Sequence, residues 1–253
     1  MRSTTVIGIA VMTATMSITP LEALAAEKAS PELQAAAEIC FGKTPKPWPE
    51  TTKACSVVAQ ANVAPDVKAA ALYNRGSGYL KSADTKSALA DYNQALKLKP
   101  KFARALQARG SLHLALGKND LALADLNKAI ELDPKSSTAF NNRALVYFTK
   151  KQFGKAIADL TKAIELDPKD AASYSSRGSA YMTLGDKEKA IADLNKALEL
   201  DPKLVIALFT RGVHYAALKE NQKAKADFQA VLALDPNNKP AKAHLERLEK
   251  VGE

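Results

Sequence analysis

Apolar residues recur at helical spacing in two successive stretches of residues 171–204. The first stretch carries a stripe typical of one helix face, formed by Tyr174, Gly178, Tyr181 and Leu184. Gly185 then signals a helix stop and Asp186 a new start. The second stretch buries Ala190, Ile191, Leu194, Ala197 and Leu198, and it ends at Pro202, because proline cannot continue a helix. This segment is predicted to form a pair of amphipathic helices.

The same pattern returns every 34 residues along most of the chain. The period is marked by the prolines Pro100, Pro134, Pro168, Pro202 and Pro236. A fixed period of this length is the signature of stacked repeats, in which each unit buries its apolar face against its neighbours. The period excludes most enzyme folds and indicates a surface that holds another molecule.

The repeat resembles the tetratricopeptide repeat (TPR), a helix–turn–helix unit of this length. With the proline at position 32, five units run 69–102, 103–136, 137–170, 171–204 and 205–238. Position 8, where the two helices approach closely, holds Gly76, Gly110, Ala144, Gly178 and Gly212. The resemblance implies an all-α solenoid of stacked antiparallel helix pairs that forms a right-handed superhelical arc. Residues 239–253 are expected to form a capping helix over the last unit.

The first 25 residues read as a secretory signal peptide. Arg2 precedes the apolar run from Val6 to Met16, and the small-residue segment Ala23–Ala25 follows. This arrangement predicts cleavage after Ala25 or Ala26. The apolar run is about half the ~20 residues that a spanning helix needs, although an uncleaved anchor stays an alternative. We therefore expect an exported protein, periplasmic or else secreted.

Export changes the interpretation of the two cysteines. An even count in an oxidising compartment favours a disulfide between Cys40 and Cys55. Residues 26–68 are expected to form a degenerate TPR-like hairpin, in which Gly42 takes position 8 and the cysteines face each other across two helices. Two buried free thiols are the alternative, and a metal site is disfavoured because no histidine or further cysteine is near.

Charge and motifs give no sign of catalysis. The chain has 36 Lys and Arg against 27 Asp and Glu, but its lysines are scattered among acidic residues without an aromatic and basic platform, so we expect no nucleic-acid partner. A weak attraction to an anionic envelope surface or to an acidic partner fits the basic balance better. None of the three histidines has the H-E-x-x-H spacing, and no G-x-S-x-G elbow occurs. We predict no enzyme activity, no cofactor and no metal.

Charged residues recur at two further repeat positions. Position 7 holds Arg75, Arg109, Arg143, Arg177 and Arg211, and position 23 holds Asp91, Asp125, Asp159, Asp193 and Asp227. These ten residues, the Arg–Asp ladder, could line a groove with cations for carboxylates. Because every arginine has its own aspartate, we favour ion pairs that tie helices together within a unit or between adjacent units.

The resemblance also implies a concave groove lined by the first helices of the units. The residues expected there are mostly polar: Tyr73, Asn74, Ser77, Arg104, Gln107, Ser111, Asn141, Asn142, Phe148, Ser175, Ser179 and Phe209. Asn74 and Asn142 match the position-6 asparagine that holds peptide backbone in several TPR proteins, and an amide both donates and accepts hydrogen bonds.

The chain is similar to small exported bacterial TPR proteins. This similarity implies a non-catalytic scaffold or adaptor in the cell envelope, which binds a peptide segment of another protein. Two alternatives stay open at this point. One is a structural assembly subunit that self-associates through its ends, and the other is a module that binds peptidoglycan or another carbohydrate.

Overall fold

The computed structural model describes residues 19–26 and 29–250, and the regular secondary structure of this part of the chain is all α-helix. It contains fourteen α-helices and no strand within the described residues. The chain divides into two compact units, residues 1–99 and 100–253, and each is described by itself. The fold is an all-α TPR repeat fold.

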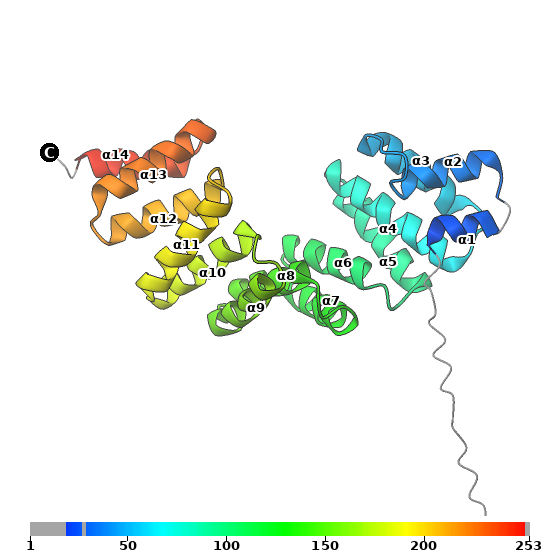
Figure 1. Cartoon of the computed structure of the whole chain (residues 1–253), viewed down its shortest axis with the longest axis horizontal. Coiled ribbons are helices and arrows are strands. Elements are labelled where there is room, and N and C mark those ends of the chain that lie inside the picture. The colour runs from blue at the N-terminus through cyan, green and yellow to red at the C-terminus, as the bar shows by residue number, and fades with distance from the viewer. Residues whose placement is uncertain (1–18, 27–28, 251–253) are drawn as a thin grey trace, which may run out of the picture. The chain divides into compact units, whose positions relative to one another are not determined.

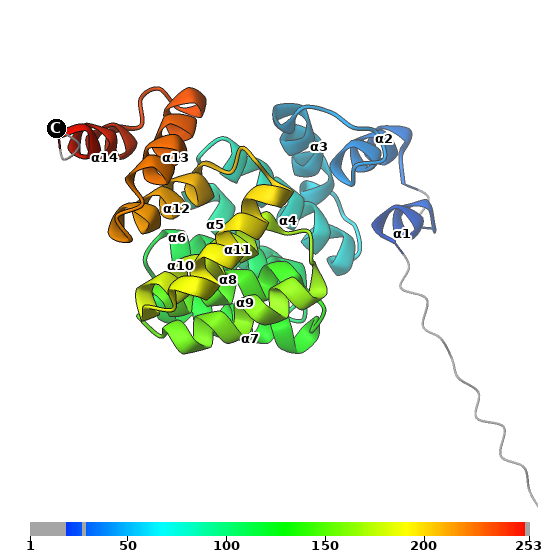
Figure 2. The same cartoon turned by 60° about the vertical axis from the view of Figure 1, so that its left-hand side comes forward.

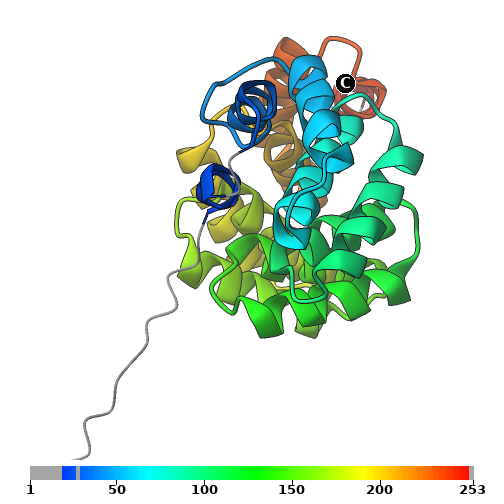
Figure 3. The same cartoon turned by 90° about the vertical axis from the view of Figure 1, so that its right-hand side faces the viewer.

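The first unit contains five helices, coloured blue to cyan in Figure 1. Their bounds are Pro20–Ala26 (α1), Pro31–Cys40 (α2), Trp48–Gln60 (α3), Pro65–Lys81 (α4) and Thr85–Leu98 (α5). Helices α2 and α3 pack against each other, and α3 also packs against α4 (Figure 3). Of the predicted signal peptide, residues 1–18 lie outside the described residues. The remainder lies in α1, whose Leu21 and Ala23 pack on the core of the α2–α3 hairpin.

The second unit contains nine helices, visible in green to red in Figure 2. Its four repeat pairs are α6 (Ala103–Ala115) with α7 (Asn119–Leu132), α8 (Ser137–Thr149) with α9 (Phe153–Leu166), α10 (Ala171–Leu184) with α11 (Lys187–Leu200), and α12 (Val205–Ala217) with α13 (Asn221–Leu234). Helix α14 (Lys239–Lys250) follows and packs on α12 and α13. Its Ala241 and Leu248 are buried in the same core as Phe228.

Short polar side chains define where several helices begin. The side chains of Ser30, Asp84, Ser136 and Asp186 accept a hydrogen bond from a backbone N–H three residues later, which satisfies one of the donors that a helix start leaves free. Gly185 ends α10 at a φ of 82°, in the left-handed region that glycine adopts without strain. These local signals set the length of each helix and leave its apolar face to be buried by packing.

The position-8 residue marks the place where the two helices of a repeat approach most closely. A Cβ built on Gly110 would lie 2.8 Å from Cγ of Leu126, and one built on Gly212 would lie 2.9 Å from Cε1 of Phe228. The unit that carries Ala144 instead also buries this residue fully. The close approach allows Leu126 and Phe228 to fill the space between the helices, and both are fully buried.

The register expected for the N-terminal hairpin is wrong at Gly42. This glycine lies beyond the end of α2 at a φ of 80°, and nothing lies within 4 Å of a Cβ built on it. It therefore serves a turn and not a close contact between helices. Helix α4 also begins at Pro65, before the expected unit start at residue 69, because proline fits the first turn of a helix.

Candidate functional site

The Arg–Asp ladder forms five bidentate ion pairs, each within one repeat. In every pair the arginine Nε and Nη2 donate to the two carboxylate oxygens of the aspartate sixteen residues later, over 2.7–2.9 Å. All five aspartates are buried. Two parallel charged hydrogen bonds are a strong and geometrically specific contact, so each pair ties the first helix of a repeat to its second.

The arginines also reach the second helix of the preceding repeat. Nη1 of Arg143 donates to Oδ1 of Asn127 over 2.9 Å, and Nη1 of Arg211 donates to Oδ1 of Asn195 over 2.8 Å. Arg177 makes the equivalent bond to Thr161 over 3.1 Å. The guanidinium groups donate to residues of their own repeat and of the preceding one. This geometry supports the structural interpretation of the ladder over a groove of free cations.

The hydrogen bonds of the ladder also favour the charged form of Arg143 and Arg177. The hydrogen bond to Asp159 raises the pKa of Arg143 above its ordinary value, and Asp193 raises the pKa of Arg177 in the same way.

The Tyr147 ring lies 5.9 Å from the Arg143 guanidinium carbon. In the 103–136 repeat the corresponding position is His113, which is buried, with Nε2 3.9 Å from Oδ2 of Asp125. Burial lowers the pKa of His113.

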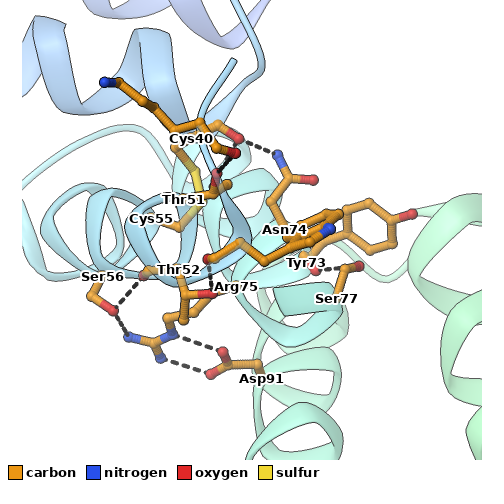
Figure 4. Close-up of a disulfide and its surroundings, with 12 residues drawn as sticks. Cys40, Thr51, Thr52, Cys55, Ser56, Tyr73, Asn74, Arg75, Ser77 and Asp91 are labelled. Carbon is orange, nitrogen blue, oxygen red and sulfur yellow. Dashed lines mark hydrogen bonds and ion pairs between the residues drawn. A yellow bond between two sulfur atoms is a disulfide. The ribbon is translucent and has the colours of Figure 1, made fainter. Parts of the chain in front are cut away.

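In the first unit, Asn74 lies where α4 meets the N-terminal hairpin. Its Nδ2 donates to the carbonyl oxygen of Cys40 over 2.9 Å (Figure 4). Cys40 is joined to Cys55 by a disulfide, with the two Cα atoms 4.8 Å apart. Ser77 Oγ donates to the carbonyl oxygen of Tyr73 over 3.1 Å. The sequence-predicted position-6 amide is thus held in place by the disulfide-bonded hairpin.

In the second unit, the predicted groove amides link the first helices of neighbouring repeats. Asn142 on α8 donates through Nδ2 to Ser111 Oγ on α6 over 2.6 Å. Asn141 donates to Ser173 Oγ on α10 over 2.6 Å. Gln107 accepts a hydrogen bond from Ser136 over 2.9 Å. These bonds stabilise repeat stacking, so part of the polar character that predicted a groove serves the fold itself.

Four further predicted groove residues differ in how far they are open to a ligand. Ser175 is only 2% exposed, so its placement as a ligand contact in the groove is wrong: the residue is buried. Phe209 is half-buried between Phe228 and His244, with ring centroids at 5.8 and 5.7 Å. Phe148 packs edge-to-face on the ring of Phe153. Arg104 is exposed on α6.

A pocket of about 290 Å³ opens beside Asn74 and the disulfide. Its lining comes from the end of α2, the loop that follows and the start of α3, and it includes Phe41, Pro45, Lys46 and Trp48. Trp48 is 42% exposed and is the only tryptophan of the chain. Sequence reasoning missed these residues, although a lone tryptophan between Pro47 and Pro49 was a visible signal; in the structure it is the first residue of α3.

Within residues 19–26 and 29–250, no group of three His, Cys, Asp or Glu side chains is placed to hold a metal ion. In the same region no helix combines the length and the apolar character that crossing a membrane requires.

Comparison with known families agrees with the repeat pattern. The model of the ETO1 C-terminal domain family, ETO1_C, matches residues 51–251. The chain belongs to this family of TPR-like domains. None of the curated proteins matches the chain.

Solved structures resemble this fold over most of its length. The APC/C hetero-tetramer Cut9–Hcn1 is 22% identical with a TM-score of 0.72, over 86% of this chain and 42% of that one. A tetratricopeptide repeat protein from Parabacteroides merdae is 24% identical with a TM-score of 0.64, over 90% of each chain. YrrB, described as a TPR protein with an unusual peptide-binding site, is 22% identical with a TM-score of 0.54, over 68% of this chain and 89% of that one. At these identities the likeness shows the fold.

Proposed function

We propose that this protein is a non-catalytic interaction scaffold of the cell envelope that binds a peptide segment of another protein. The family supports a protein-binding role, and the relative YrrB has a peptide-binding site by its description. In the second unit, the side-chain amides of Asn141 and Asn142 form hydrogen bonds between neighbouring repeats. The proposal therefore centres on the first unit, where Asn74 lines a pocket.

The observation that carries the proposal is that a hydrogen bond holds the side-chain amide of Asn74 in place in the lining of that pocket. Because Nδ2 is committed to the Cys40 carbonyl over 2.9 Å, the orientation of the amide is fixed. Within the part of the chain that the structure describes, no donor occupies its Oδ1. A fixed acceptor beside Phe41, Pro45 and Trp48 suits a backbone N–H of an extended peptide, with an apolar side chain in the pocket.

Trp48 allows a direct test, because its fluorescence reports on this pocket alone. Peptides are selected from a random display library on the immobilised chain, and their binding is measured by the change in Trp48 emission. Trp48→Ala and Asn74→Ala should each weaken binding of a labelled selected peptide about tenfold in fluorescence anisotropy, which corresponds to about 1.4 kcal/mol. The matched control is Asn237→Ala, which changes an exposed turn asparagine.

Stability needs a separate measurement in this test. Asn74→Ala also removes the hydrogen bond to Cys40, so we expect it to lower the melting temperature as well as the affinity. Trp48 is substantially exposed, and Trp48→Ala should leave the melting temperature almost unchanged. Unaltered affinity in a folded Trp48→Ala chain would refute the proposed site.

We further propose that the protein is exported, to the periplasm or beyond the cell. The support is the signal-like segment Val6 to Ala25 together with the disulfide between Cys40 and Cys55, since disulfides persist in oxidising compartments. Mass spectrometry of the envelope fraction should find a first residue at Ala26 or Glu27. Retention of residues 1–20 there would contradict cleavage, and recovery of the protein from the cytosol would contradict export.

A further inference from the structure

A second pocket lies in the second unit, between the last repeat and the capping helix α14. Its volume is about 540 Å³, within the range of about 300–1,000 Å³ that small-ligand sites occupy. Residues from the C-terminal half of α12, from the turn that follows it, from the first residue of α13 and from α14 line it. It contains none of the residues of the Asn74 pocket.

The floor of this pocket is apolar. Val213 and Ala216 on α12 pack on the buried core that includes Leu248 of α14. His244 closes one side, with its ring stacked on Phe228 at a centroid distance of 5.0 Å and an angle of 19°. A floor of this kind takes an aliphatic side chain, because such a chain gains free energy when its surface leaves water.

Two cationic residues of the lining have no acidic partner among the described residues. Lys219 and Arg247 both line the pocket and are exposed. Within residues 19–26 and 29–250, no carboxylate oxygen lies within 4.0 Å of their charged nitrogens. Nearby Lys223, in contrast, pairs with Glu220 over 2.5 Å. The positive field of Lys219 and Arg247 is thus left for a ligand to neutralise.

Two polar residues in the lining favour a peptide over a lipid. Asn221 contributes a side-chain amide to the lining. His244 contributes an imidazole, and burial followed by the charge of Arg247 lowers its pKa, which favours the neutral ring. A neutral imidazole and an amide each donate and accept hydrogen bonds. A peptide backbone can use these groups, whereas a fatty-acid chain would leave them without partners.

We propose that the pocket between α12 and α14 is a second docking site, which takes an acidic peptide segment with an aliphatic side chain in the pocket and carboxylates on Lys219 and Arg247. This inference is independent of the Asn74 pocket, because the two sites share no residue. It extends the proposed scaffold by naming a second ligand class.

The test uses a fluorescein-labelled peptide in which two aspartates precede two leucines, titrated with the full chain and followed by anisotropy. Reversal of both cations, in Lys219→Glu with Arg247→Glu, should weaken binding at least about tenfold. Ala217→Phe fills the pocket from an exposed position and should weaken binding without any change in charge. The matched control, Lys203→Glu with Lys242→Glu, makes the same change in net charge at exposed lysines outside the lining.

Each outcome decides the proposal. Loss of binding in the charge reversal and in Ala217→Phe, with an unchanged control and unchanged circular-dichroism melting, supports it. Equal loss in the control means general attraction to a basic chain and overturns it. So does equal binding of a peptide with asparagines in place of the aspartates, or no peptide binding at all. Binding of dodecanoate without the peptide assigns the pocket to a lipid and also overturns it. Trp48 emission is read in parallel, so failure of the first site is seen separately.

Discussion

Disruption of one ladder pair provides a quantitative test of how the repeats are held together. Arg143 and Asp159 are joined by two hydrogen bonds of 2.7 Å, and their side chains are 19% and 10% exposed. Removal of one partner from a buried pair costs about 3–5 kcal/mol, because the other charge is left without compensation. After Asp159→Ala, however, the Arg143 guanidinium keeps its bond to Asn127.

The two single variants should therefore differ in stability. We expect Asp159→Ala to lower the free energy of unfolding by about 2–3 kcal/mol and Arg143→Ala by about 3–4 kcal/mol, because the latter strands a more deeply buried carboxylate. The double variant should cost about as much as Arg143→Ala alone, so that the coupling energy is about 2–3 kcal/mol. Urea unfolding followed by circular dichroism at 222 nm measures all four chains of the cycle.

A surface pair in the same repeat supplies the control for this cycle. Lys162 and Glu165 lie 3.0 Å apart with side chains 47% and 59% exposed, and exposed pairs contribute only about 0.2–1 kcal/mol. Additive effects at Arg143 and Asp159, or a coupling no larger than that of the surface pair, would refute the structural interpretation. The cations would then be free to serve a ligand.

Three further predictions concern a close helix contact, a buried histidine and the disulfide. Gly178→Ala should lower the free energy of unfolding by about 1–3 kcal/mol, because its Cβ would lie 3.0 Å from a core leucine and 3.1 Å from a backbone carbonyl. Gly154 lies on a helix with open space around it, so Gly154→Ala should instead raise the free energy of unfolding by about 0.5–1 kcal/mol. Equal effects of the two variants in urea titrations would contradict the close approach at Gly178. Burial lowers the pKa of His113 below 6.5, so the stability that its neutral form provides is present above that value and is lost as the pH falls. Between about pH 7.5 and pH 5.5, the His113→Tyr chain should therefore lose less stability than the parent chain. Parallel pH profiles of the two unfolding free energies would disprove this. Thiol labelling of the denatured, unreduced exported chain should find neither Cys40 nor Cys55 free, and stoichiometric labelling of both would exclude the bridge.

Much of the fold could be predicted because the same local signals recur in every repeat. Helix propensity, caps and proline act over a few residues, so their positions can be read directly from the chain. The small residue at position 8 reports a close contact that the next helix must meet, and Gly110 and Gly212 both meet it in the structure. The prediction fails at Gly42, because the N-terminal hairpin does not repeat the 34-residue pattern clearly enough to set its register.

The sequence by itself thus determined the repeat length and the helix pairs, because these depend on spacing along one chain. It supplied an aspartate for each ladder arginine, but only the tertiary structure decided that every pair lies within one repeat. Tertiary structure alone decided which polar groups are left for a ligand. Asn142 and Asn141 are polar by sequence, yet packing brings them within hydrogen-bonding distance of serines about thirty residues away. Both pockets likewise arise where a helix from outside the regular repeats meets a regular one. Such cavities depend on the shapes of two surfaces in contact, and no periodicity in the sequence encodes them.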